Sequence, residues 1–281
     1  MKGHNNRMKV PATSALMLFY TRPIYTTSLE QQYLDNIDFD EINELTTGMD
    51  AAYSLFDQML LLRKQYIRRM LQEILADSSY QQLLSLGAGH DPLSFHVLEN
   101  YPTVFENIYE VDIANMNNKS SFYKQYTTDD QLLHFLQCDI TNAAKLWQTL
   151  TSNGYNHNLP VIIVFEGVIH FITDDEFLAV MQLFKSDNRR NIVLMDYTLS
   201  DESVPDTVLK GHQGCLRCVG NYVEGLFNTH TRDEMKELVE VVDGEIISLQ
   251  SMQEIEYAVK EYNDFFTQPG EGIEEMLTFR I

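Results

Sequence analysis

Short apolar runs alternate with amphipathic segments through the middle of the chain. Five runs of five to seven residues have the composition of buried strands, and they cover 82–86, 107–112, 133–139, 161–166 and 192–196. Helical patterns lie between them, at 92–100, at 143–150 and after Thr173. Apolar strands that alternate with helices indicate a parallel sheet covered on both faces. The sequence therefore predicts an α/β protein with a doubly wound, mostly parallel sheet.

A longer helix precedes the first of these strands. Over residues 51–75, apolar side chains recur at steps of three and four, which marks one buried helical face: Leu55, Met59, Leu62, Tyr66, Met70 and Ile74. Cations lie among them, and we interpret Lys64, Arg68 and Arg69 as solvated helix charges. Short helices expected in residues 1–50 complete an N-terminal helical cover, 1–75, over a core at 82–196.

The alternation breaks after the fifth strand. Residues 197–230 predict a long polar connection that contains four glycines, Gly211, Gly214, Gly220 and Gly225. Connections of this length are usually functional, so we expect a lid insertion that contacts the acceptor.

The end of the chain, residues 231–281, predicts one helix and two strands. Thr231 and Glu234 form a capping box that opens a helix over 232–242. The segments 246–249 and 276–281 are candidate edge strands. Because the sequence shows no linker, repeat or low-complexity segment, we expect a single domain over residues 1–281.

Charge and apolar content narrow the class of protein. The net charge of −21 argues against a nucleic-acid partner, because phosphates need a basic surface. No apolar run approaches the ~20 residues of a membrane span, and the first seven residues lack a signal-peptide pattern. We therefore expect a cytoplasmic protein with no membrane partner.

The three cysteines, Cys138, Cys215 and Cys218, do not suggest a disulfide framework. His212, Cys215 and Cys218 have a spacing that a zinc site can use, and His230 is the one plausible fourth ligand. We expect reduced thiols in a polar loop and no metal.

The first strand runs directly into Gly87-Ala88-Gly89-His90-Asp91. Glycines at a strand end let the backbone approach a ligand closely, and Asp91 with Pro92 suits the start of a helix. A dinucleotide fingerprint would have a third glycine where Pro92 stands, and the turn lacks Lys and Arg. The pattern indicates a nucleoside site without a pyrophosphate, with S-adenosylmethionine as the leading candidate. A tight connection without a ligand is the alternative.

Three acids are the last residues of strands of the predicted sheet, and ligands of open α/β sheets sit beyond the carboxyl ends of strands. We expect Asp112, Asp139 and Glu166 to reach one crevice with Gly87 and Gly89. A carboxylate at Asp112 suits the ribose hydroxyls, and one at Asp139 suits the adenine amine. Glu166 would face the ammonium or sulfonium end of the ligand. This set favours an adenosyl site.

Three segments carry a resemblance to a known family: 86–91 (Leu-Gly-Ala-Gly-His-Asp), 109–112 (Tyr-Glu-Val-Asp) and 165–171 (Phe-Glu-Gly-Val-Ile-His-Phe). Together they resemble the leucine carboxyl methyltransferase family, over about residues 63–196. That family has the class I S-adenosylmethionine-dependent methyltransferase fold. It includes the enzyme that methylates the C-terminal carboxylate of the phosphatase 2A catalytic subunit, and bacterial O-methyltransferases of secondary metabolism.

The resemblance implies an S-adenosylmethionine-dependent methyltransferase and a role for each matching position. The residues it places on the cofactor are Arg63 at the carboxylate, Gly87 and Gly89 at the methionine part, Asp112 at the ribose, Asp139 and Ile140 at the adenine, and Glu166 beside the methionine end. Two departures concern the acceptor side: Pro92-Leu93 replaces a Thr-Arg type pair, and Phe171, preceded by His170, replaces a common tyrosine.

The acceptor decides whether the reaction needs a base. A carboxylate is already ionised at pH 7, whereas a phenol or alcohol usually needs a general base. The candidate bases are His170, His212 and His230. Arg217 and Arg232 are candidate partners for an acceptor carboxylate. Phe171 is a further candidate for binding the acceptor. We favour in-line methyl transfer to a carboxylate, either of a small molecule or of a peptide C-terminus, over methylation of a hydroxyl group.

Two other classes of function stay open. One is a nucleotide-dependent oxidoreductase, against which Pro92 counts. The other is a non-catalytic protein that binds an adenosyl metabolite or a partner. A protein substrate such as phosphatase 2A is an alternative to the small molecule.

Overall fold

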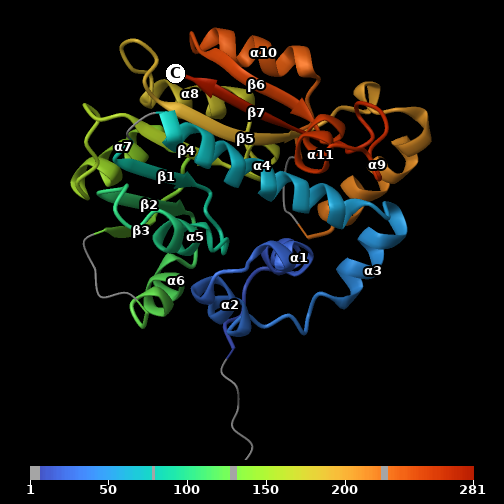
Figure 1. Ribbon diagram of the computed structural model, residues 1–281, viewed down its shortest axis with the longest axis horizontal. Helices are drawn as coiled ribbons and strands as arrows, with labels where there is room; N and C mark the ends of the chain where they lie inside the picture. The colour runs from blue at the N-terminus through green and yellow to red at the C-terminus, as the bar shows by residue number, and fades with distance from the viewer. Residues whose placement is uncertain (1–6, 78–79, 127–131, 223–226) are drawn as a thin grey trace, which may run out of the picture.

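The computed structural model describes residues 7–77, 80–126, 132–222 and 227–281, in which a seven-stranded sheet is covered by helices (Figure 1). The strands lie in the order β3-β2-β1-β4-β5-β7-β6. β1 to β5 are parallel, and β7 runs antiparallel between β5 and β6. The strands are β1 (Gln82–Leu86), β2 (Asn107–Asp112), β3 (Leu133–Gln137), β4 (Val161–Phe165), β5 (Ile192–Thr198), β6 (Glu245–Ser251) and β7 (Glu274–Arg280). The predicted doubly wound, mostly parallel sheet is confirmed.

Helices lie on both sides of this sheet, with α4 in front of the strands and α8 behind them in the view of Figure 1. Capping boxes open α8 at Thr173 and α10 at Thr231, as the sequence predicts. The helices are α1 (Ala12–Thr21), α2 (Ser28–Asp35), α3 (Asn43–Ala52), α4 (Phe56–Asp77), α5 (Leu93–Asn100), α6 (Met116–Tyr123), α7 (Ala143–Ser152), α8 (Asp174–Leu183), α9 (Asp206–Gly220), α10 (Arg232–Val241) and α11 (Met252–Lys260).

The direction of chain travel across the sheet reverses at β1. The chain moves outward from β1 to β2 and β3 and then returns to place β4 on the other side of β1. In open α/β sheets the carboxyl ends of strands at such a reversal leave a crevice where ligands bind. β1, β4 and β5, which lie next to one another at this reversal, are buried along their whole length.

The prediction that residues 197–230 form a long polar connection is wrong in its secondary structure. Residues 206–220 form the helix α9, and two of its glycines, Gly211 and Gly214, face α3: a Cβ on Gly211 would lie 2.9 Å from the carbonyl oxygen of Ala52. Gly211 and Gly214 therefore permit close helix packing, where the sequence suggested a flexible connection. Cys215 is buried on the helix and Cys218 half-buried, so the thiols do not lie in a polar loop. Gly225 lies outside the described residues.

Three other expectations differ at element boundaries. The helix expected over 51–75 is two helices, because α3 ends at Ala52 and α4 begins at Phe56. β7 is an inner strand, paired with β5 on one side and β6 on the other. α5 begins after Pro92, although the Asp91 carboxylate still accepts the N–H of Leu93 at 2.8 Å. None of the helices that the structure describes is both long and apolar enough to span a bilayer.

Candidate active site

A cavity opens at the carboxyl ends of β1 and β4. Its floor is the glycine turn after β1, one wall is the inner face of α4, and α1 and α9 close it from the outside. The predicted residues that line it are Arg63, Gly87, Gly89, Glu166, His170, Phe171 and His212. Segments from both halves of the chain therefore meet at the crevice that the strand order predicts.

The glycine turn has a backbone that only glycine adopts readily. Gly87 and Gly89 have φ of +68° and +49°, and a Cβ on Gly87 would lie 2.4 Å from Cγ2 of Val168. The N–H of Gly87 donates to the carbonyl of Val111, and the N–H of Gly89 donates to the Asp112 carboxylate at 2.8 Å. Asp112 thus holds the turn from the end of β2. It is not among the described residues that line the cavity, and its role at the ribose stays a prediction.

A buried ion pair beneath the turn was not anticipated from the sequence. Lys119 pairs with Glu110 and donates to the carbonyl oxygens of Gly89, at 3.2 Å, and Asp91, at 2.7 Å. Both charged side chains are almost completely buried. Burial raises the pKa of Glu110, and the ammonium group of Lys119 opposes that rise. The pair fixes the turn from below.

His90, within the turn, also lines the cavity. Its Nδ1 is 3.1 Å from the hydroxyl group of Tyr33. Its Nε2 is buried and finds no hydrogen-bond partner among the described residues. Burial, together with the charge of Lys119, lowers the pKa of His90 to about 4, so the ring is neutral at pH 7. His90 therefore offers a neutral ring nitrogen to a ligand.

Arg63 projects from α4 into a group of three carboxylates. Its Nε donates to Glu166 at 3.0 Å, and its Nη1 donates to Asp196 at 3.0 Å and Glu274 at 3.1 Å. Burial alone would lower the pKa of Arg63, but these carboxylates raise it. Burial alone would raise the pKa of Asp196, but the guanidinium of Arg63 holds it well below its usual range. In the described part of the chain, Nη2 makes no such bond and is left for a ligand anion.

Lys64 is a site residue that the sequence interpretation missed. The prediction of a solvated charge is wrong, because its Nζ pairs with Asp91 and lies 2.7 Å from Glu166. Burial opposes ionisation of Asp91, but Lys64 lowers its pKa to about 2. The sequence contained one indication that Lys64 is buried. Leu60, Ile67 and Leu71 form a second apolar face of α4, and Lys64 lies on that face.

Arg68 and Arg69 are also engaged rather than simply solvated. Arg68 pairs with the buried Glu30 of α2 and donates to the carbonyl of Ile24 at 2.6 Å. Arg69 donates to the side chain of Gln250 on β6 at 2.8 Å. α4 packs against α1, α11 and the sheet and so has little free surface, which is why these cations find partners.

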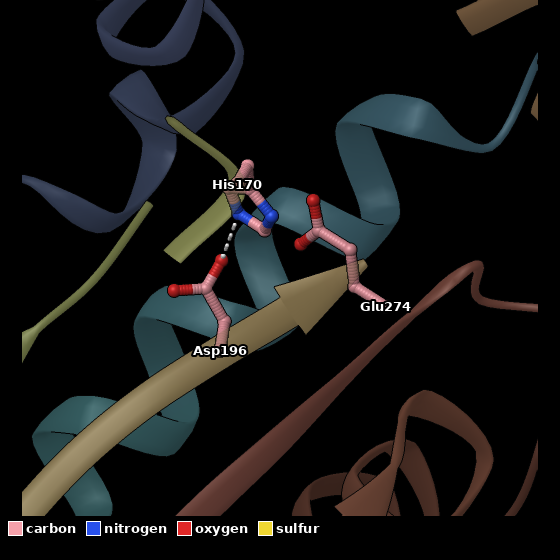
Figure 2. Close-up of side chains that lie close together, drawn as sticks. All are labelled: His170, Asp196 and Glu274. Carbon is pink, nitrogen blue, oxygen red and sulfur yellow. Dashed lines mark hydrogen bonds and ion pairs between the residues drawn. The ribbon is translucent and has the colours of Figure 1, made fainter. Parts of the chain in front are cut away.

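Figure 2 shows His170, Asp196 and Glu274 gathered above the ends of β5 and β7. The His170 Nε2 is 3.2 Å from Asp196, and its Nδ1 is 3.2 Å from the hydroxyl group of Thr198. Buried His and carboxylate ligands of this kind can hold a metal. Here Arg63 already donates to both carboxylates, so a cation would meet the guanidinium, and we assign no metal to these residues.

Residues 21–185 match the sequence model of the leucine carboxyl methyltransferase family, and these 165 positions are more than half of the 281-residue chain. The chain belongs to the leucine carboxyl methyltransferase family. The resemblance inferred from the sequence is confirmed, and the protein is an S-adenosylmethionine-dependent methyltransferase.

Two solved structures are similar to this methyltransferase over nearly the whole chain. One is a protein of Thermobifida fusca assigned as a methyltransferase, with a TM-score of 0.68, 14% identity, and coverage of 96% of this chain and 95% of that one. The other is a DUF574-family protein of Streptomyces avermitilis, with a TM-score of 0.65, 13% identity, and coverage of 96% and 97%. At these identities the likeness concerns the fold. No curated protein sequence matches the chain.

The cavity of this methyltransferase fits the charges of its cofactor. S-adenosylmethionine carries a carboxylate, an ammonium group and a sulfonium. Two cations, Arg63 and Lys64, line the cavity where the structure describes it, and four acids line it with them: Asp91, Glu110, Glu166 and Glu274. The free Nη2 of Arg63 and the unpartnered Nε2 of His90 add donor and acceptor atoms. The excess of acids suits a ligand with a net positive charge.

Two predicted adenine contacts of the methyltransferase lie at the sheet end outside the described cavity lining. Asp139 comes two residues after β3 and accepts hydrogen bonds from the N–H and hydroxyl groups of Thr141, at 3.0 and 2.7 Å. Ile140 is buried in the core. Their role at the adenine stays a prediction.

Three predicted acceptor-side residues lie away from the described cavity wall. His230 is 2.8 Å from Asp174 at the start of α8. Arg232 pairs with Glu275 through two hydrogen bonds, at 2.9 and 2.7 Å. Arg217 is exposed on α9. The wall that α9 does present is mainly apolar and comprises His212, Cys215, Leu216 and Val219.

Proposed function

We propose that the protein transfers the methyl group of S-adenosylmethionine to an oxygen atom of a small acceptor with an apolar body. The observation that carries this is the composition of the cavity: its acids and two cations come from α4, the glycine turn and residues in or directly after strands of the sheet, and α1 and α9 contribute mainly apolar side chains. The apolar residues of that outer side are Leu16, Met17, Phe56, Phe171, Leu216, Val219 and Phe227.

In this proposal the chain's own residues bind and orient the cofactor. Arg63, through Nη2, and Lys64 bind its carboxylate, and Glu166 lies beside its ammonium group. Asp112 accepts from the ribose hydroxyls while it holds the Gly89 N–H. The bound cofactor supplies a methyl group on a positively charged sulfur. In-line transfer then needs alignment and a dry site, which the apolar wall provides.

Family membership suggests a carboxylate as the acceptor, whereas the charges of the cavity favour an uncharged group. Arg217 and Arg232, the expected partners of an acceptor carboxylate, lie away from the described lining. Arg63 and Lys64 already face Asp91, Glu166, Asp196 and Glu274. An acceptor carboxylate would therefore add a negative charge to a cavity whose acids exceed its cations. This supports a hydroxyl acceptor.

Calorimetric titration of S-adenosylmethionine and S-adenosylhomocysteine tests the cofactor side. We expect Asp112→Ala to weaken binding at least about tenfold, or ~1.4 kcal/mol, because it removes both the ribose acceptor and the partner of the Gly89 N–H. The matched control is Asp187→Ala, which removes an exposed carboxylate and should bind like the wild type. Absence of binding to the wild-type protein would contradict the proposal.

The acceptor side is tested with methyl-labelled cofactor and matched sets of acceptors, each set containing an aromatic alcohol, a phenol and a carboxylic acid. Label in an O-methyl product supports the proposal, and label only on carbon or nitrogen contradicts it. Mild alkali separates the two oxygen acceptors, because it hydrolyses a methyl ester and leaves a methyl ether intact.

A further inference from the structure

His212 is a buried polar residue in the outer wall of the cavity. It lies on α9, its side chain has no solvent exposure, and it faces the cavity that the cofactor residues line. Neither of its ring nitrogens makes a hydrogen bond within the part of the chain that the structure describes. A buried polar group that makes no hydrogen bond is unfavourable, so a bound molecule that supplies the hydrogen bond would be favoured.

His170, which also lines the cavity, is already engaged. Its two ring nitrogens face Asp196 and Thr198, each at 3.2 Å. His230 is 2.8 Å from Asp174, at the start of α8. The Nδ1 of His230 also lacks a hydrogen-bond partner among the described residues, but His230 is not among the residues that line the cavity. Of the three histidines expected near the acceptor, His212 is therefore the one that lines the cavity with neither ring nitrogen hydrogen-bonded to a described residue.

The surroundings of His212 suit a proton acceptor. Its Nε2 is 3.4 Å from the carboxylate of Asp201, which is itself held at 2.7 Å by the side chain of Gln213. Burial lowers the pKa of His212, so the ring is neutral at pH 7, while Asp201 and the carbonyl of Leu199 favour its protonated form. A neutral imidazole beside a carboxylate can take a proton and is then stabilised as an imidazolium.

The other groups at this end of the cavity leave the acceptor without a cationic partner. The titratable residues nearby are Cys215 on α9, His170 after β4 and Glu274 on β7. Burial raises the pKa of Cys215 to about 12, so the thiol is neutral. Glu274 is bound to Arg63. An uncharged hydroxyl group is the acceptor that a neutral histidine in an apolar wall would recognise.

We propose that His212 accepts a hydrogen bond from the hydroxyl group of the acceptor and removes its proton during transfer. The acceptor is then an alcohol or phenol with an apolar body. The acceptor oxygen forms its bond to the methyl carbon, the carbon–sulfur bond breaks with its electrons on sulfur, and the proton moves to His212 and then to water. S-adenosylhomocysteine, the methyl ether and one proton are the products. This inference rests on the proposed function and specifies its substrate class.

The test compares His212→Gln with the wild type on phenols of increasing pKa and on matched carboxylic acids. Glutamine keeps a polar side chain but is no base at pH 7. We expect kcat on a phenol of pKa near 10 to fall by about 100-fold or more, the range of general-base catalysis. The loss should shrink for phenols already ionised at the assay pH and as the pH rises toward the phenol pKa.

Two binding measurements separate a chemical role from damage to the fold. S-adenosylhomocysteine should bind His212→Gln and wild type equally, which reports an intact cofactor site. With S-adenosylhomocysteine present, the phenol should bind the variant more weakly in calorimetry. His157→Gln, an exchange of an exposed histidine, is the matched control and should behave like the wild type.

Different outcomes overturn different proposals. A loss that is equal for all phenols and acids, or no loss at all, rejects the role of His212. Transfer by the wild type to carboxylic acids alone rejects the hydroxyl acceptor and leaves O-methylation standing. Absence of cofactor binding to the wild type rejects the proposed function itself.

Discussion

At the scale of single residues, the direction in which a side chain leaves its helix decides its role. Arg63 and Lys64 are neighbours on α4, and both are buried and line the cavity. Lys64 lies between Asp91 and Glu166, each on a different loop. Its charge therefore connects the glycine turn to the end of β4.

We expect Lys64→Met to lower the free energy of unfolding by about 3 kcal/mol, because breaking a buried ion pair leaves its carboxylates without their cation. Urea denaturation at pH 7, followed by circular dichroism, measures the change. Lys145→Met, on the exposed side of α7, is the control and should change stability by no more than about 0.5 kcal/mol. Equal effects of the two exchanges would restore the view that Lys64 is a surface charge.

The sequence predicted some of these residues and not others for a physical reason. Gly87, Asp112 and Glu166 follow strands, and the carboxyl ends of parallel strands meet at one edge whatever the rest of the chain does. Lys119 and Glu274 reach the site from α6 and β7, and their burial depends on how those elements pack. The pairing of charges across distant segments is a tertiary property.

At the scale of elements, the crossing of α3 and α9 sets the position of the acceptor wall. A Cβ on Gly214 would lie 2.8 Å from Cβ of Ala52, and one on Gly211 would lie 2.9 Å from the Ala52 carbonyl oxygen. The two helices approach this closely because glycine has no side chain at the contact. His212 lies between the two glycines, so its place in the cavity depends on this crossing.

Gly211→Ala should destabilise the protein relative to Gly220→Ala by about 1–3 kcal/mol, the usual cost of overpacking. Both exchanges gain helix propensity, and no described atom lies within 4 Å of a Cβ on Gly220, so their difference isolates the contact with α3. Thermal or urea unfolding measures it. If the Gly211→Ala variant were as stable as the Gly220→Ala variant, the result would contradict the close packing of α3 and α9 at Gly211.

At the scale of the whole molecule, segments from the beginning of the chain close over the glycine turn (Figure 1). The hydroxyl group of Tyr25 donates to the Asp91 carboxylate at 3.0 Å, and Tyr33 contacts His90 at 3.1 Å. Residues of α1 line the same cavity. A ligand on the turn therefore contacts α1 as well as the sheet.

Binding of S-adenosylhomocysteine should slow amide hydrogen exchange in the glycine turn, 87–91, and in α1 together, because both line the cavity. α10 packs on α8 and β6, away from the described lining, and serves as the internal control with unchanged exchange. Hydrogen exchange with mass spectrometry reports each segment separately. Protection of α10 equal to that of the turn would contradict a ligand site between α1 and the sheet.

The sequence by itself determined the alternation of strands and helices, the glycine turn and the acids at the strand ends. These are local properties: apolar runs, capping residues and glycines are specified by neighbours along the chain. The family and its cofactor followed from the same segments. Arg63 was also predicted, from the resemblance.

Only the tertiary structure decided the partners of Arg63 and Lys64, the helical form of α9 and the inner position of β7. It also distinguished His212, with unengaged ring nitrogens in the cavity, from His170 and His230, which are hydrogen-bonded elsewhere. The reason is that burial and charge pairing depend on contacts between segments far apart in sequence. Local pattern brings the strand ends to one edge of the sheet, but it does not specify how α6, α9 and β7 pack around them.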